Sequence, residues 1–223
     1  MRKKIINNTY LINAWINNKK ALLKKYYSEV PDSLIPCFDK ELRELGFEYE
    51  IGSQPIGFMP RYKKEILPIA IRYYQLAKEQ RKFNEQNYFM RFLGFKGFEE
   101  VVPMLIEDYY SNATQDLTRW FISDCIYQIK SKKYIKDYID IASNSDFGVN
   151  RQMIILLLGK LKAEDSIPIL INLLEDEQVR LQAISALGMF KREEFRCYFE
   201  RFENSTQTGW RKYARIALKK LNN

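Results

Sequence analysis

The sequence contains no histidine at all, although it is 223 residues long. This absence excludes Ser-His-Asp and Cys-His nucleophile chemistry, HExxH zinc sites and histidine proton shuttles. Any enzymatic activity would have to rest on carboxylates, lysine, tyrosine or arginine. The sequence therefore favours a non-enzymatic function, with no metal and no cofactor.

Cysteine is scarce as well, and Cys37, Cys125 and Cys197 lie far apart in the sequence. Their spacing does not match a zinc site, and an odd number of cysteines cannot pair completely in disulfides. We therefore interpret them as reduced thiols of a cytoplasmic protein. Asparagines interrupt the basic N-terminus and no cleavage site follows, so we predict no signal peptide. No apolar run reaches the roughly 18 residues that a membrane span requires.

Glycine and proline are few, with nine and seven residues, which disfavours a turn-rich sandwich or barrel. The net charge of +8 is concentrated at one end of the chain. Residues 1–82 contain 16 Lys and Arg against 9 Asp and Glu, whereas residues 83–223 contain 20 against 19. The basic excess therefore belongs to the first third of the chain, and the remainder is close to neutral.

The sequence does contain a repeat, which is most regular in residues 150–190. There an arginine opens an apolar run that ends in Leu-Gly, and the same pattern begins again after a second amphipathic segment. Self-similarity at a nearly fixed spacing is the signature of a helical solenoid. Each repeat is predicted to contain a first and a second helix. The first helices align at 93–94, 126–127, 158–159, 187–188 and 218–219, and the second helices align at 66–68, 101–103, 135–136, 167–168 and 195–197. Pro68, Pro103 and Pro168 are predicted near the N-termini of their second helices, where a missing N–H is harmless.

A ladder of aspartate and arginine accompanies these repeats. An arginine stands seven residues before the Leu-Gly position of each later first helix, and an aspartate shortly precedes three of the four arginines. Stacked Asp and Arg side chains at repeat junctions are typically structural, because one guanidinium can donate to a carboxylate and to loop carbonyls. We therefore interpret this ladder as structural. Its members are Asp116, Arg119, Asp146, Arg151, Asp176 and Arg180, with Arg211 at the equivalent position of the last helix.

The apolar-Pro second helices, the ladder and the Leu-Gly ends together resemble HEAT repeats over residues 61–221. The segments YKKEILP, GFEEVVPMLIEDY and DFGVNRQMIILLLGKLK are similar to a family of uncharacterised bacterial HEAT-repeat proteins. The resemblance implies an all-α, right-handed superhelix of about five helical pairs. Residues 1–60 would form a basic N-terminal helical cap that includes the first helix of repeat one. Within this range we expect a helix at 2–27, a second helix that ends at Gly46, and an irregular connection at 47–60. Residues 61–223 would form the repeats and a terminal helix at 210–221.

The first helix that aligns at 126–127 departs from the repeat pattern at Asp124, where the later repeats place mostly apolar residues. An unpaired carboxylate is costly at a core-type position. The equivalent residue one repeat earlier is Arg91, so we predict an ion pair between Arg91 and Asp124, with Trp120 one turn before Asp124. Trp-x3-Asp also resembles the catalytic cluster of HEAT-like DNA alkylation-repair glycosylases. In that alternative, Trp120 and Asp124 face a damaged nucleotide and Arg151 faces a phosphate.

Two further regions are candidates for binding. The pairs Tyr73/Tyr74 and Tyr109/Tyr110 stand late in two second helices, and we expect one tyrosine of each pair in the core and its neighbour on the concave face. Tyr74, Tyr109 and Lys136 are the predicted binding residues of this ridge. The lysines of residues 1–27 interleave with aromatic residues, so they could bind nucleic acid. The alternative is a solvated cap of the solenoid.

Taken together, these features favour a cytoplasmic scaffold or adaptor that binds another protein with its concave face. One specific version is an immunity-type inhibitor of its partner. The alternative is a nucleic-acid-binding protein, including the glycosylase-like activity centred on Trp120 and Asp124. We expect no interaction with membranes.

Overall fold

The computed structural model describes residues 30, 32–47 and 61–221, and it divides the chain into two compact units, residues 1–51 and residues 52–223. The described residues form α-helices and short 3-10 helices, with no strand among them. Each of these helices is too short or too polar to cross a membrane. The helix predicted at 2–27, with its lysines, and all but the first residue of the connection predicted at 47–60 lie outside the described residues.

The first unit contributes one described helix, α3 (Ile35–Glu44). At its start, the hydroxyl of Ser33 accepts a hydrogen bond from the backbone N–H of Ile35 at 3.3 Å. At its end, Gly46 adopts the left-handed conformation with φ of 83°, and its N–H donates to the carbonyl of Arg43 at 2.8 Å. Glycine is favoured there because a side chain would clash in this conformation. The predicted helix end at Gly46 is confirmed.

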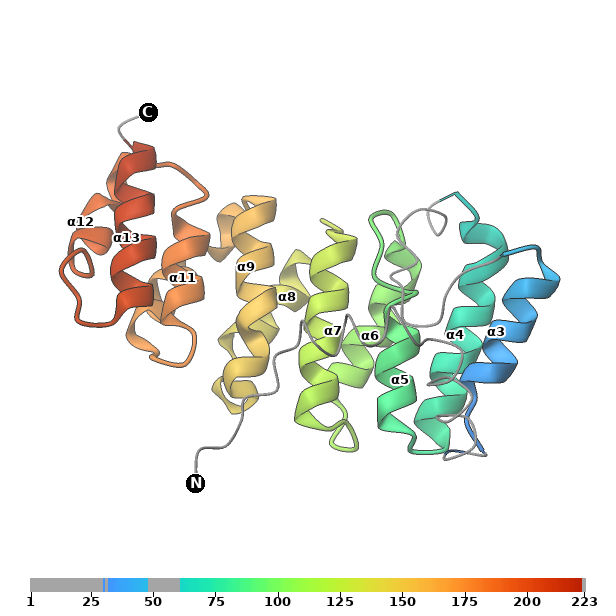
Figure 1. The fold of residues 1–223 in the computed structure, drawn as a ribbon. Coiled ribbons are helices and arrows are strands. Elements are labelled where there is room, and N and C mark those ends of the chain that lie inside the picture. Colours follow the sequence, from blue (N-terminus) through green and yellow to red (C-terminus); the bar gives the residue numbers. More distant parts are fainter. Residues whose placement is uncertain (1–29, 31, 48–60, 222–223) are drawn as a thin grey trace, which may run out of the picture. The chain divides into compact units, whose positions relative to one another are not determined.

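The second unit is a solenoid of helices in two layers, with the first helices side by side in one layer and the second helices in the other (Figure 1). Its described part contains ten α-helices, which confirms the predicted all-α solenoid. The first helices are α5 (Phe83–Met90), α7 (Asp116–Ile129), α9 (Gln152–Leu161), α11 (Arg180–Leu187) and α13 (Thr208–Leu221). The second helices are α4 (Lys63–Glu79), α6 (Val102–Tyr110), α8 (Ile135–Ser143), α10 (Ile167–Asn172) and α12 (Arg196–Glu200).

Short 3-10 helices join these elements. They are η1 (Glu99–Val101), η2 (Ser145–Arg151), η3 (Glu164–Ser166), η4 (Leu173–Glu175) and η5 (Glu193–Phe195). Three of them, η1, η3 and η5, lead directly into second helices, and η2 leads into α9. Most second helices are therefore short, and the longer first helices form the more continuous layer.

The Leu-Gly ends of the first helices allow neighbouring first helices to pack closely. A Cβ atom added at Gly159 would lie 2.5 Å from the Cα of Ala186, and one added at Gly188 would lie 2.9 Å from the Cβ of Ala217. Both distances are shorter than carbon atoms tolerate. The recurring glycine is thus a packing requirement between adjacent first helices, which explains why it marks the repeat.

Proline positions follow the prediction in two of three second helices. Pro103 and Pro168 lie in the first turns of α6 and α10, where the missing N–H costs nothing. Pro68 instead lies inside α4, because this helix begins at Lys63, five residues before the proline. The prediction for Pro68 was therefore wrong. Its ring removes the N–H that would otherwise bond to the carbonyl of Lys64.

Candidate functional site

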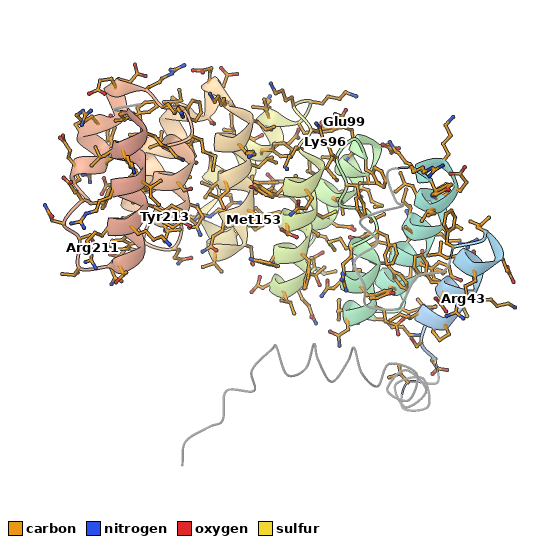
Figure 2. The ribbon with its side chains drawn as sticks, turned by 45° about the horizontal axis from the view of Figure 1, so that its top comes forward. Arg43, Lys96, Glu99, Met153, Arg211 and Tyr213 are labelled. Atoms are coloured by element: carbon orange, nitrogen blue, oxygen red, sulfur yellow. The ribbon has the colours of Figure 1, made fainter. Side chains whose placement is uncertain are left out.

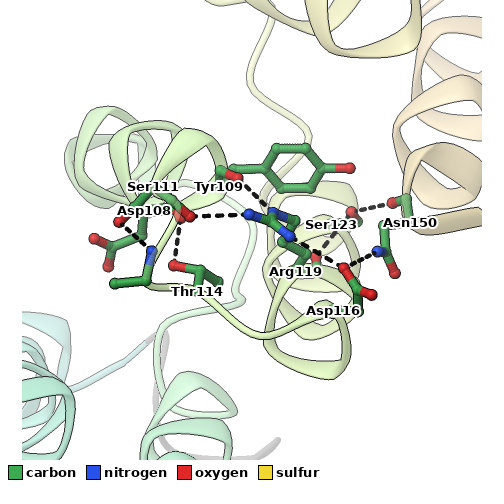
Figure 3. A network of polar contacts seen from close by, with 9 residues as sticks. Asp108, Tyr109, Ser111, Thr114, Asp116, Arg119, Ser123 and Asn150 are labelled. Carbon is green, nitrogen blue, oxygen red and sulfur yellow. Dashed lines mark hydrogen bonds and ion pairs between the residues drawn. The ribbon is translucent and has the colours of Figure 1, made fainter. Parts of the chain in front are cut away.

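Arg119 is the centre of a polar network at the junction between two repeats (Figure 3). Its guanidinium donates to the carbonyls of Tyr109 and Ser111, both at 2.9 Å, and to the carboxylate of Asp116 at 3.0 Å. The side-chain amide of Asn150, in the next repeat, donates to the same carboxylate at 3.3 Å. The network therefore closes the end of α6 and connects it to the following repeat.

Arg151 occupies the equivalent position one repeat later and is only 1% exposed. It donates to the carbonyls of Ala142 and Gly148, both at 3.0 Å, and to the carboxylate of Asp176 at 2.6 Å. Burial alone would raise the pKa of Asp176, but the hydrogen bond and charge of Arg151 outweigh it, so this pKa lies below its ordinary value. A guanidinium buried in this way cannot face a phosphate, which contradicts the role that the glycosylase alternative gives to Arg151.

Arg180 and Arg211 continue the series. Arg180 donates to the carbonyls of residues 174 and 175, at 2.5 and 3.0 Å, and its guanidinium carbon lies 4.3 Å from the centre of the Trp210 ring. Arg211 donates to the carbonyl of Ser205 at 2.7 Å. Each arginine of the series therefore hydrogen-bonds to carbonyls at or just beyond the end of the preceding second helix, where helices leave such groups without internal partners.

Asp146 does not take part in these contacts. It is exposed, and its carboxylate forms no ion pair within the part of the chain that the structure describes. Four residues, including Gly148 in the left-handed region, separate Asp146 from Arg151, whereas two separate Asp116 from Arg119. The inclusion of Asp146 in the ladder was therefore wrong.

A pocket of about 390 Å³ lies between the end of α5 and the second half of α7. Both Arg91 and Asp124 line it, but the predicted ion pair between them does not form. The carboxylate of Asp124 instead accepts a hydrogen bond from the amide of Gln128 at 3.4 Å. The reason is that α5 ends at Met90, so Arg91 begins a turn and is not on a helix that stacks against α7.

The pocket combines cationic and aromatic side chains around Asp124. Its walls include Arg91, Lys96 and Lys130, and the rings of Phe95 and Phe121. Burial raises the pKa of the Asp124 carboxyl, and the hydrogen bond from its neighbour opposes this only in part. Three cations and one carboxylate thus line this pocket.

Trp120 lies outside the pocket lining, on the same helix. Its side chain is 37% exposed, and its ring contacts that of Phe121 with 5.5 Å between centroids. The structure thus brings Arg91 and Asp124 to one pocket and places Trp120 beyond it.

The two tyrosines predicted to bind a partner are core residues. Tyr74 and Tyr109 are both fully buried. The hydroxyl of Tyr74 donates to the carboxylate of Asp108 at 2.5 Å, and burial together with this negative charge raises the pKa of Tyr74. Tyr73 is buried too, so the first pair has no exposed member. The prediction of Tyr74 and Tyr109 as binding residues was wrong, because both lie on the face of their helix that packs inward.

The exposed tyrosine is Tyr110, which is 42% accessible at the end of α6. Its ring contacts that of Phe147 with 5.4 Å between centroids. Burial raises the pKa of Tyr110, and the carboxylates of Asp140 and Asp137 on α8 raise it further. We call Glu107, Tyr110, Asp137, Asp140 and Phe147 the Tyr110 surface. The expectation of one buried and one exposed tyrosine holds for the second pair only, where the exposed residue is Tyr110 and not the predicted Tyr109. The position of Phe147 gave no signal in the sequence.

Lys136, also predicted as a binding residue, is exposed on α8 next to this surface. No group of three or more cysteine, aspartate or glutamate side chains in the described ranges is arranged to hold a metal ion.

Comparison with known families decides what these helical pairs are. Residues 135–219 match the sequence profile of HEAT repeats. The segment from α8 through most of α13 therefore consists of HEAT repeats. No curated protein and no solved structure matches it. HEAT repeats form helical scaffolds that commonly interact with other proteins.

The second helices are strongly acidic from η1 onward. Through α12, these helices and the 3-10 segments that flank them contain twelve carboxylates against two cations, Lys136 and Arg196. Seven of the twelve carboxylates are in ion pairs, such as Glu100 with Lys63 at 2.7 Å. On the Tyr110 surface, in contrast, the three carboxylates form no ion pair with any described residue. This surface thus presents negative charge that the fold does not neutralise.

Proposed function

We propose that this HEAT-repeat protein is a non-enzymatic scaffold that binds a cationic segment of a partner protein with the Tyr110 surface. The observation that carries the proposal is the exposed ring of Tyr110 beside carboxylates that form no ion pair with a described residue. A lysine or arginine of a partner could lie against the aromatic faces of Tyr110 and Phe147 while Asp137 and Asp140 supply the counter-charge. Aromatic rings and cations attract one another through the ring quadrupole.

The composition of the Tyr110 surface suits protein recognition better than phosphate recognition. Tyrosine is enriched among the residues that dominate the binding energy of protein interfaces, and carboxylates around it accelerate association with a basic partner. The same carboxylates would repel a nucleic acid backbone. This face is the second-helix face, which the repeat pattern predicts to be concave and which is the usual binding face of a solenoid.

A more specific version of the proposal is that binding blocks the activity of the partner protein, as an immunity-type inhibitor does. The motivation is a small solenoid without histidine whose charged surface could cover a basic functional site. The partner would then be a cytoplasmic protein. An activity assay of the captured partner, with and without added scaffold, tests this form. If the activity of the partner is unchanged at a saturating concentration of the scaffold, the protein is an adaptor and not an inhibitor.

The test of the main proposal is affinity capture from cells of the source organism with three forms of the full chain. The wild type is compared with Asp137→Lys/Asp140→Lys and with a control, Glu79→Lys/Glu200→Lys, which makes the same change of charge at exposed residues outside the Tyr110 surface. We expect one protein to be recovered with the wild type and the control, and about tenfold less of it with the Asp137/Asp140 variant. Equal recovery with all three forms, or none with the wild type, contradicts the proposal.

A further inference from the structure

Three lysines close successive first-helix segments in the left-handed conformation. Lys130 has φ of 58°, Lys162 has φ of 50° and Lys191 has φ of 57°. In the preceding repeat the equivalent residue is Gly97, with φ of 89°. Glycine is the usual residue at such a position because a Cβ atom is disfavoured there. Lysine thus recurs at the same position of three consecutive repeats, although the left-handed backbone conformation there disfavours any residue with a Cβ atom.

Helix stabilisation does not explain this choice. A cation near a helix C-terminus interacts favourably with the helix dipole. In α9, however, Lys160 already supplies such a charge from within the last turn, in ordinary helical conformation. Lys162 therefore adds strain where the dipole is already compensated. The feature that these three positions share is therefore the positively charged side chain itself.

The three lysines lie at one edge of the solenoid. They occupy equivalent ends of neighbouring first helices, and these helices pack side by side. Lys96 lies at the same edge, where Figure 2 shows it next to Glu99. Lys132 and Lys160 lie within two residues of Lys130 and Lys162. We call this set the lysine edge: Lys96, Lys130, Lys132, Lys160, Lys162 and Lys191.

The carboxylates along this edge are mostly neutralised by other cations. Glu99 pairs with Lys133 at 2.7 Å, and Glu100 pairs with Lys63 at 2.7 Å. Further along, Arg192 pairs with Glu164 and Glu194, and Arg196 pairs with Glu193. None of the six lysines of the lysine edge forms an ion pair with a described carboxylate. Two carboxylates beside them, Asp124 and Asp165, also form no ion pair with a described residue. The edge therefore carries a surplus of positive charge.

We infer that the lysine edge binds the phosphate backbone of a nucleic acid. Adjacent packed helices are spaced by about 8–10 Å, so the lysines of successive repeats offer cations at a regular interval to a chain of phosphates. No large exposed apolar side chain of the described residues lies among these lysines. Protein interfaces are anchored by such side chains, whereas backbone binding needs only a regular row of cations. The lysine edge is distinct from the Tyr110 surface, so this inference does not depend on the proposed function.

The test measures binding of the full chain to a fluorescein-labelled 20-nucleotide polythymidine at several salt concentrations. We expect the wild type to bind with an affinity that falls steeply as salt rises. Lys130→Gln/Lys162→Gln/Lys191→Gln should bind about tenfold more weakly or worse at 50 mM salt, and its log–log salt slope should be shallower by about 2. A control with the same loss of charge, Lys64→Gln/Lys136→Gln/Lys212→Gln, should stay within about twofold of the wild type.

A second variant separates loss of charge from loss of fold. Lys130→Gly/Lys162→Gly/Lys191→Gly relieves the left-handed strain, so its melting temperature should rise by about 5 °C while its binding falls as in the glutamine variant. Absence of wild-type binding, or equal binding by all variants, overturns the inference. Preferential displacement of the oligonucleotide by polyglutamate of equal length also overturns it, in favour of an acidic protein. A glycine variant that is no more stable than the wild type overturns the argument from strain.

Discussion

Replacing Gly159 by alanine should destabilise the solenoid, although alanine is the better helix former. The added Cβ would lie 2.5 Å from the Cα of Ala186 and 2.7 Å from its carbonyl oxygen, whereas carbon contacts normally begin near 3.5 Å. Helices α9 and α11 must then separate locally by about 1 Å. Overpacking of this kind costs about 1–3 kcal/mol, and removing glycine from a helix returns about 1 kcal/mol. Because the obstructing atoms are mostly backbone, which cannot rotate away, we expect a net loss of about 2 kcal/mol.

Two other glycines provide graded comparisons for this prediction. At Gly188 the nearest atom is the Cβ of Ala217 at 2.9 Å, and at Gly94 the nearest atoms belong to Cys125 at 3.3 Å. Urea unfolding followed by circular dichroism at 222 nm should therefore rank the alanine variants in stability as Gly94 above Gly188 above Gly159, with Gly94→Ala within about 0.5 kcal/mol of the wild type. A Gly159→Ala variant as stable as the wild type, or a reversed order, would refute this account of first-helix packing.

Three further predictions concern the buried polar groups. Arg151→Met should cost about 3–4 kcal/mol in urea unfolding, because it leaves a carboxylate and two carbonyls without a donor, whereas Asp146→Ala should change stability by less than about 0.5 kcal/mol. Because the pKa of Asp176 is lower in the folded than in the unfolded chain, its charge stabilises the fold near neutral pH and this contribution is lost as the pH falls through the folded value. The melting temperature of the wild type should thus fall more steeply below about pH 4 than that of Asp176→Asn. Tyr74→Phe should lower the free energy of unfolding by about 1–2 kcal/mol, whereas Tyr110→Phe should leave it unchanged.

The sequence was sufficient to predict the fold because the repeat positions are set by backbone geometry. The Leu-Gly positions mark where first helices touch, and Gly46 marks a left-handed helix end. Both are requirements of the main chain that only glycine meets readily, so they are visible in a single sequence. Pro68 shows the limit of this approach, since α4 begins four residues before the point at which the other proline-containing second helices begin.

The candidate site was less predictable, because it depends on side-chain direction. Tyr109 and Tyr110 are neighbours in the sequence, and a rotation of about 100° per residue decides which one is buried. The expected pair of Arg91 and Asp124 failed for a similar reason, since α5 stops one residue before the arginine. Periodicity predicts which residues are equivalent, but the place where a helix ends decides whether equivalent residues meet.

The most direct test of the Tyr110 surface is site-specific photo-crosslinking in cells of the source organism. Benzoylphenylalanine replaces Tyr110 in one form of the chain and Lys212, an exposed residue of α13, in a control form. The account predicts one discrete adduct from position 110, with the cross-link in a segment of the partner rich in lysine or arginine, and no such adduct from position 212. No adduct from position 110, or the same adducts from both positions, would contradict it.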